Sequence, residues 1–177
     1  MNSINQQQPE HNEENLTGQS AIDRIKQTFK KTQTCFFCTG TIVGSDDVRP
    51  MNVRKVDDEG ALWFLSAEDS HKNQELESDP SVVLLFQGSP HSDFLQLKGR
   101  ATISRDRAKI KELWEPIIKT WFTGGVDDPR ITVIKVTPHE GYYWDNKHGN
   151  LVAGVKMMIG AATGKTLDDS IEGKVSL

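Results

Sequence analysis

The chain lacks an excess of basic residues, has only two cysteines and contains no long apolar run. Its 177 residues include 21 Lys and Arg against 25 Asp and Glu, a formal net charge of −4. Nucleic-acid binding needs clustered cations that neutralise phosphates, so the composition argues against it. No apolar run approaches the roughly 18 residues of a membrane span. The N-terminal segment MNSINQQQPEHNEEN lacks the basic start and apolar stretch of a secretory signal, which predicts a cytoplasmic protein without membrane or nucleic-acid partners.

The chain has two cysteines, Cys35 and Cys38, whose C-x-x-C spacing invites a metal or redox interpretation. However, the segment CFFCTGTIV that contains them is rich in aromatic and β-branched residues, which is typical of a strand. Residues i and i+3 of a strand point to opposite faces, so the two thiols cannot share one ion. No second C-x-x-C or His pair supplies further ligands, and the sequence predicts no metal site.

Length and composition predict one domain of ordinary size. Hydrophobic residues make up 36% of the chain and charged residues 26%, which allows a core of moderate size. Residues 1–18 are polar and predict a disordered tail. The domain proper is expected over residues 19–149. Residues 150–177 mix Gly, Lys and Asp and are predicted to form a C-terminal extension of uncertain order.

Short strands predominate in the pattern of the domain. Period-two alternation, buried apolar runs and turn sequences predict strands at residues 35–43, 49–56, 61–66, 81–87, 94–104, 131–136 and 141–144. Strands joined by short hairpins favour an antiparallel barrel or sandwich over a parallel sheet. The predicted fold class is therefore mainly β, a β-barrel with flanking helices.

Three helices interrupt these strands. The first starts near Ser20, which with Asp23 resembles a capping box. A second, at residues 70–78, ends before Pro80. The third, at residues 106–122, has a clear amphipathic pattern, which predicts that Trp121 faces the core. Pro116 lies inside that pattern and predicts a kink or a break.

The junction from Trp63 to Leu76 combines groups that favour an anion. A strand ends near Ser66, Ser70 is a suitable N-cap, and Lys72 lies in the first helical turn. A helix N-terminus presents free N–H groups and the positive end of the dipole, so a lysine there is unfavourable unless an anion is bound. The segment thus predicts a phosphate site. The alternative is a capped surface helix with a solvated lysine.

The strand at residues 49–56 is strongly basic for a hairpin strand. Pro50 cannot donate to a sheet ladder, so it belongs at a strand start or edge. One basic side chain of this strand can reach the same phosphate. For Arg54 and Lys55 together, a solvated outer face is the favoured interpretation.

The order of several short motifs is more specific than any one of them. Arg49-Pro50-Met51, Leu62 to Ser66, Ser70-His71-Lys72 and Pro80-Ser81-Val82 are followed by Trp121 to Gly125 with Asp128-Pro129, and then by Tyr143-Trp144. Over residues 21–145 this order resembles the pyridoxamine-5′-phosphate-oxidase-like FMN-binding proteins, and within them the general stress protein type.

The resemblance implies an antiparallel split barrel that works as a homodimer, with FMN at the subunit interface. The cofactor-binding positions that it implies are Arg49, Pro50, Met51, Asn52, Val53, Lys55, Phe64, Leu65, Ser66, Ser70, His71, Lys72 and Trp144. Ser70, His71 and Lys72 match the phosphate-binding turn, with Arg49 as the first choice from the strand and Lys55 as the second. His71 stands where the oxidases usually have Arg, which weakens phosphate binding or makes it pH-dependent. Trp144 is expected near the ring from the other subunit. Trp121 is a weaker candidate, since its periodicity already explains it as a core-facing helix residue.

The resemblance also has limits. The oxidases end in an Arg-x-His signature, and here Asn146 stands two positions before His148, so oxidation of pyridoxine phosphates is not expected. The implied function is a flavin-dependent oxidoreductase that acts on a small molecule in a stress response. Two alternatives stay open: a non-catalytic flavin-storage protein, and a barrel that binds haem or a deazaflavin. No residue is assigned as a catalytic acid or base.

Overall fold

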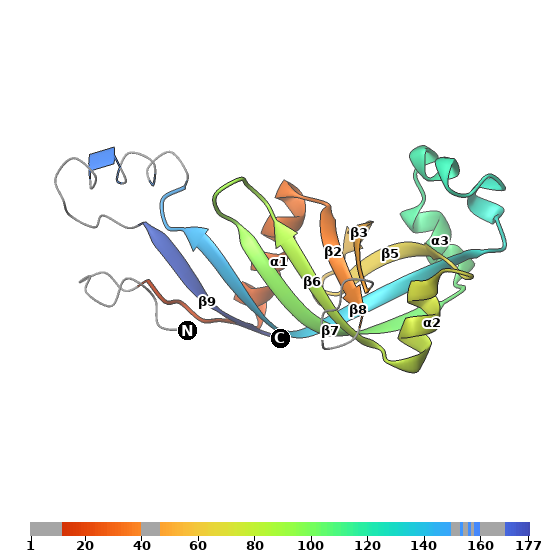
Figure 1. Cartoon of the computed structure of the whole chain (residues 1–177), viewed down its shortest axis with the longest axis horizontal. Helices are drawn as coiled ribbons and strands as arrows, with labels where there is room; N and C mark the ends of the chain where they lie inside the picture. Colours follow the sequence, from red (N-terminus) through yellow and green to blue (C-terminus); the bar gives the residue numbers. More distant parts are fainter. Residues whose placement is uncertain (1–11, 40–46, 150–152, 154–155, 157, 160–168) are drawn as a thin grey trace.

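The computed structural model describes residues 12–39, 47–149, 153, 156, 158–159 and 169–177 (Figure 1). Residues 1–11 of the predicted tail and most of residues 150–168 of the predicted extension lie outside the described residues. A long curved sheet runs through the molecule, with α1 behind its middle and with α2 and α3 at one end. The mainly β class with flanking helices is confirmed.

The described residues form a nine-stranded sheet. The strands are β1 (Leu16–Thr17), β2 (Thr34–Thr39), β3 (Val48–Asn52), β4 (Lys55–Val56), β5 (Leu62–Ala67), β6 (Ser81–Gln87), β7 (Phe94–Ser104), β8 (Ile131–Asn146) and β9 (Ser170–Ser176). The helices are α1 (Gln19–Lys31), α2 (His71–Ser78) and α3 (Arg107–Leu113), with 3₁₀ turns η1 (Pro116–Thr120) and η2 (Gly125–Asp127). The sheet order is β1-β9-β8-β7-β6-β2-β3, and β5 pairs with β4 and β8.

Strand β8 is shared between two parts of the sheet. Its first half pairs with β5, from Ile131 to Val136, and its second half pairs with β9, from Glu140 to Asn146, while β7 pairs along both. The register of β7 and β8 shifts between Lys98 and Gly99. A Cβ at Gly99 would lie 2.6 Å from the carbonyl oxygen of Thr137, so only glycine allows this approach. At this bulge the pairing partner of β8 changes from β5 to β9. The sheet does not close, and the result is a split barrel.

Three predicted boundaries differ from the structure. The strands predicted at residues 131–136 and 141–144 are one strand, because the bulge accommodates Pro138 within the sheet. The strand predicted at residues 49–56 is split into β3 and β4 at Val53-Arg54. The predicted disordered tail contains β1, whose Leu16 pairs in parallel with β9, so the sheet includes one parallel pair.

The helices follow the sequence pattern with two exceptions. Ser20 does not cap α1; Gly18 occupies that position, and the Ser20 hydroxyl donates to the carbonyl oxygen of Thr17. Asp106 caps α3 by accepting from the backbone N–H groups of Ala108 and Lys109. The predicted helix 106–122 is shorter than expected and stops at Leu113, but the break predicted at Pro116 is confirmed, and the chain continues as η1.

Two apolar clusters hold the sheet and its helices together. The larger fills the barrel and includes Phe37, Phe64 and Leu97, with Ile25 of α1 packed against them. The smaller holds the segment from α3 to η2 against β5 and β8 through residues such as Ile118. The clusters fix this helical segment beside the ends of β3 and β5, where the candidate site lies.

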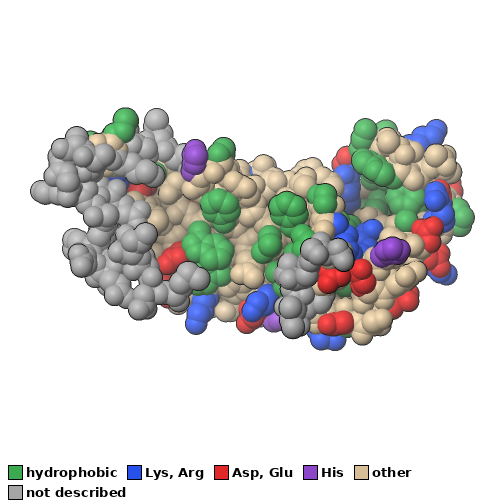
Figure 2. Space-filling model, viewed as in Figure 1, with side chains coloured by type: hydrophobic (Ala, Val, Ile, Leu, Met, Phe, Trp, Pro, Cys, Tyr) green, Lys and Arg blue, Asp and Glu red, His purple; other side chains and the backbone are tan. Residues whose placement is uncertain are grey.

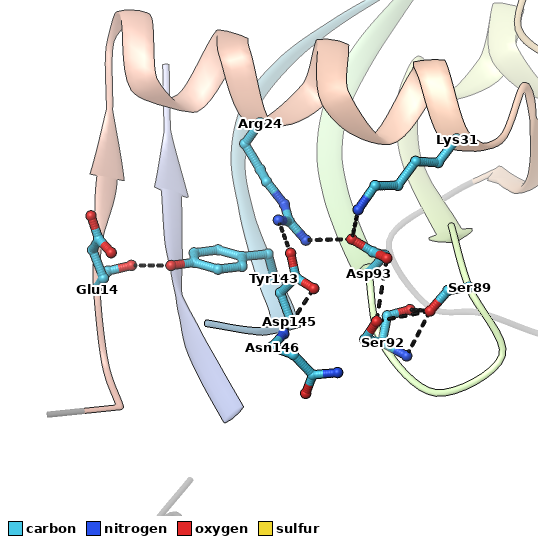
Figure 3. Close-up of polar contacts among 9 residues, drawn as sticks. All are labelled: Glu14, Arg24, Lys31, Ser89, Ser92, Asp93, Tyr143, Asp145 and Asn146. Atoms are coloured by element: carbon cyan, nitrogen blue, oxygen red, sulfur yellow. Dashed lines mark hydrogen bonds and ion pairs between the residues drawn. The ribbon is translucent and has the colours of Figure 1, made fainter. Parts of the chain in front are cut away.

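A buried charge cluster joins α1 to two distant parts of the sheet (Figure 3). Arg24 donates to the carboxylate of Asp145 in β8, and its guanidinium lies 4.8 Å from the centre of the Tyr143 ring. Asp93, before β7, forms an ion pair with Lys31 and lies 3.9 Å from Arg24. Burial, the largest single effect, raises the pKa of Asp93, but the hydrogen bonds from Lys31 and Asp145 and the charges of Lys31 and Arg24 together hold the pKa below its usual value.

Replacement of Arg24 by Met should destabilise the protein by about 3–5 kcal/mol, because Asp145 then loses its buried partner. Urea denaturation measures this change. Lys26→Met is the matched control on the same helix, since Lys26 pairs with an exposed Asp58 and its loss should matter little. Equal unfolding midpoints for the two variants would contradict the structural role of the cluster.

Candidate functional site

A cleft of about 770 Å³ lies between β3, β5, the start of α2 and the η1 segment. It brings together seven of the predicted site residues: Arg49, Pro50, Met51, Asn52, Leu65, Ser66 and Lys72. Positions 49–52 form most of β3, and positions 65 and 66 lie near the end of β5. The hairpin-like return of the chain from β3 to β5 and the turn into α2 therefore place residues distant in sequence around one cavity.

Two cations, Arg49 and Lys72, lie at one end of the cleft. Arg49 donates from one terminal nitrogen to Glu75 over 2.6 Å and from the other to the Thr39 hydroxyl over 3.4 Å. Lys72 is half-buried and makes no hydrogen bond or ion pair with any residue that the structure describes. Burial lowers the pKa of Lys72, and the charge of Arg49 lowers it further. A bound anion would stabilise the charged form of this lysine.

The first turn of α2 adds backbone donors beside Lys72. Ser70 has the extended backbone of an N-cap residue, but no side chain caps the free N–H groups of the turn. These groups and the helix dipole favour an anion at this point. A lysine with no partner, an arginine and a helix N-terminus together form an electropositive corner of the cleft. Figure 2 shows charged and histidine side chains gathered beside α2.

A buried polar network fixes the start of α2 against the sheet. The side-chain oxygen of Asn73 accepts from the hydroxyl groups of Ser66, at 2.8 Å, and Ser70, at 3.2 Å. The Asn73 amide nitrogen donates to the Thr132 hydroxyl, which donates in turn to the carbonyl oxygen of Ser66. Because these groups satisfy one another, the turn that carries Lys72 is held by β5 and β8 together.

The wall opposite the strands is apolar and comes from η1. Ile117 is 60% exposed and Trp121 67% exposed, whereas the neighbouring Ile118 and Phe122 are buried in the smaller cluster. The prediction that Trp121 faces the core is therefore wrong: Pro116 ends the helix, and the tighter turn that follows turns Trp121 into the cleft.

Arg54 holds this wall in place. It donates to the carbonyl oxygen of Leu113 at 3.3 Å and pairs with Glu115 at 2.5 Å, so it bridges β3 and the helical segment. The expectation of a solvated outer face for Arg54 is wrong for that reason. The cleft residues that the sequence did not single out as binding residues are Gln33, Arg54, Ala67, Glu115, Ile117, Ile118 and Phe122. The signal for Ile117, Ile118 and Phe122 was the apolar pattern of the third helix, which does not show which side chains a break exposes.

The structure places the remaining predicted residues away from the cleft lining. Val53 and Phe64 are fully buried in the core, and Lys55 pairs with Glu112 on α3. His71 is exposed and does not line the cleft. Ser70 reaches the cleft only through Ser66, whose hydroxyl lies 3.2 Å from its own.

Trp144 lies on the outer face of the sheet, next to Tyr142, with the two ring centres 4.8 Å apart. On the same face the register aligns Pro50 of β3, Phe36 of β2 and Leu85 of β6. Phe36 is 56% exposed and Leu85 is exposed as well. This row of exposed apolar side chains, called the outer apolar row below, starts at the cleft, because Pro50 lines both (Figure 2). The sheet is thus apolar on both faces along these strands.

The fold and the cleft define a split barrel with an electropositive corner beside an apolar wall. The family model described as pyridoxamine 5′-phosphate oxidase like matches residues 20–168, and the chain belongs to this family. A segment of 90 residues is 31% identical to protein bli-3 of Neurospora crassa and spans 46% of this chain but only 43% of that relative. The resemblance to this family is confirmed.

Solved structures support the same fold. A general stress protein 26 from Jannaschia sp. CCS1 is 22% identical with a TM-score of 0.70, over 88% of this chain and 95% of that chain. The general stress FMN/FAD binding protein from Xanthomonas citri is 22% identical with a TM-score of 0.56, over 67% of this chain and 82% of that one. Among the described residues no cluster of His, Cys, Asp and Glu could hold a metal ion. No helix in the described part of the chain is long and apolar enough to cross a membrane.

Replacement of Asn73 by Ala should destabilise the protein by about 1–3 kcal/mol, because it leaves the buried hydroxyls of Ser66 and Thr132 without their partner. The urea midpoint measures the effect. Gln74→Ala, at the next and exposed position of α2, is the matched control. A loss no greater than that of the control would show that the network does not hold the turn.

Proposed function

We propose that the cleft binds a flavin mononucleotide, with its phosphate in the electropositive corner formed by Arg49, Lys72 and the N-terminus of α2. The observation that carries this proposal is the half-buried Lys72, which has no partner among the described residues. A phosphate monoester has nearly two negative charges and three acceptor oxygens, which suit two cations and free backbone donors. The family and the FMN/FAD-binding protein of Xanthomonas citri support a flavin as the ligand.

The size and lining of the cleft fit the rest of this cofactor. Small-molecule sites usually measure about 300–1,000 Å³, and this cleft falls within that range. Met51 and Leu65 on the strands and Trp121 on η1 offer apolar contact to a planar ring. No histidine or cysteine lines the cleft, and a methionine such as Met51 ligates haem iron together with a histidine, so the lining favours a flavin over haem.

We further propose that two copies of the chain form a homodimer through the outer apolar row. Apolar side chains on both faces of a sheet need cover on both faces, and a second copy of the same row provides it. Because Pro50 belongs both to this row and to the cleft, the cleft then lies at the subunit interface. In this arrangement Trp144 of the partner subunit is available to the ring.

The proposed activity is that of a flavin-dependent oxidoreductase acting on a small molecule. The flavin supplies the hydride or electron transfer, and the protein binds and orients it and excludes water. The exposed side chain of Ile117 favours this activity over flavin storage, because it leaves an apolar surface for a second molecule. Reduction of the bound flavin by NADH or NADPH distinguishes an oxidoreductase from a storage protein. If neither NADH nor NADPH reduces the flavin, the result favours storage.

Lys72→Ala should weaken binding of FMN at least about tenfold, which corresponds to about 1.4 kcal/mol, and should leave binding of riboflavin unchanged. Riboflavin has the same ring without the phosphate, so the ratio of the two dissociation constants isolates the phosphate contribution. Quenching of flavin fluorescence in a titration gives both constants. Lys30→Ala, at an exposed position of α1, is the control. An unchanged ratio of the two dissociation constants would show that Lys72 does not bind the phosphate.

Phe36→Glu should convert a dimer into a monomer, because a charge at the centre of the outer apolar row opposes burial against a second copy. Size-exclusion chromatography with light scattering gives the molar mass. Met158→Glu places the same charge at another exposed apolar residue, away from the described row, and should leave the mass unchanged. A monomeric wild-type protein, or a dimeric Phe36→Glu variant, would refute this interface.

A further inference from the structure

Glu75 lies at the back of the electropositive corner. It is on α2, three residues after Lys72, and does not line the cleft. One of its carboxylate oxygens accepts from Arg49 over 2.6 Å and from the Thr39 hydroxyl over 2.7 Å. Arg49 in turn lies 3.4 Å from the same hydroxyl. Three elements, α2, β3 and β2, therefore meet in one closed set of hydrogen bonds.

We propose that Glu75 is a positioning residue for the phosphate site, which holds the guanidinium of Arg49 at the cleft wall beside Lys72. This inference rests on the proposed function. An arginine side chain has about 2 kcal/mol of rotamer entropy, and its planar fork binds an anion well only when its orientation is fixed. Bonds to Glu75 and Thr39 engage both terminal nitrogens of Arg49, and neither partner lines the cleft, so the anion meets an arginine that is already oriented.

The opposite role has to be weighed, because a carboxylate also repels an anion. Arg49, Lys72 and Glu75 together have a net charge of +1, and removal of the carboxylate would raise it to +2. If repulsion dominated, loss of Glu75 would strengthen phosphate binding. Two observations favour positioning. Glu75 lies outside the cleft lining, whereas its partner Arg49 belongs to it, and the Thr39 hydroxyl fixes the carboxylate in that place.

The bond from Arg49 also keeps the carboxylate ionised. Hydrogen bonds from Arg49, the larger effect, and from Thr39 hold the pKa of Glu75 below its usual value, although burial raises it. The pair is therefore charged near neutral pH, where a charge-assisted hydrogen bond orients Arg49 more firmly than a neutral one.

The test compares FMN with riboflavin for the wild type, Glu75→Gln and Glu75→Ala, with fluorescence titrations as the measurement. Both variants should bind FMN about tenfold more weakly, as is usual for loss of a partner that orients a binding residue, and should bind riboflavin as the wild type does. Glu77→Gln on the same helix, at an exposed position, is the matched control and should change neither constant. Unchanged riboflavin binding also shows that each variant is folded.

A second arm repeats the measurement in an Arg49→Ala background. If Glu75 acts through Arg49, Glu75→Gln should have no further effect on the ratio of FMN to riboflavin affinity there. An equal loss of both flavins, a gain in FMN affinity, or the same tenfold loss in the Arg49→Ala background would each overturn the inference. If the wild type itself bound FMN no more tightly than riboflavin, the proposed phosphate site would fail first, and this result is distinct from the other three.

Discussion

The pairing of β8 with two different strands is the constraint on which the rest of the structure depends. The first half of β8 pairs with β5 and the second half pairs with β9. The bulge opposite Gly99 lies where the pairing partner of β8 changes. A substituent at Gly99 would meet the backbone of Thr137, so this glycine sets how closely β7 and β8 approach. Strand β5 pairs with β4 and β8 and does not belong to the main strand order of the sheet. The C-terminal end of β5 and strand β3 therefore line the cleft together.

The same strand reaches the candidate site through Thr132. This residue, near the start of β8, closes the network of Ser66 and Asn73 and so fixes the first turn of α2. The turn sets the position of Lys72, and one helical turn later Glu75 holds Arg49. Sheet geometry is thus transmitted to the electropositive corner through buried hydrogen bonds rather than through a flexible loop. Such support limits the freedom of the cationic groups before any anion arrives.

The sequence predicted those elements correctly whose conformation depends mainly on their own local sequence. The apolar run of β6 and the alternation of β7 gave the observed bounds at residues 81–87 and 94–104, and the Ser70-His71-Lys72 turn gave the start of α2. The prediction was wrong where contacts between residues distant in sequence determine the course of the chain. The strands predicted at residues 131–136 and 141–144 are one strand, because β7 and β8 accommodate Pro138 in a bulge. Trp121 matched a helical core pattern, but the break at Pro116 exposes it, and periodicity does not show how the chain turns after a break.

The replacement of an expected arginine by His71 has less effect on the proposed site than its position in the motif suggests. His71 is exposed outside the cleft lining, so the anion would meet Arg49, Lys72 and the free N–H groups of α2. Two half-buried cations and one carboxylate, which is bonded to Arg49, leave an excess positive charge, and burial lowers the pKa of Lys72. A bound dianion would neutralise this excess positive charge. It would also stabilise the folded protein by linkage, since only the native state assembles the electropositive corner from β3 and α2. The binding of the phosphate and the stability of this end of the sheet are therefore coupled through the same two cations.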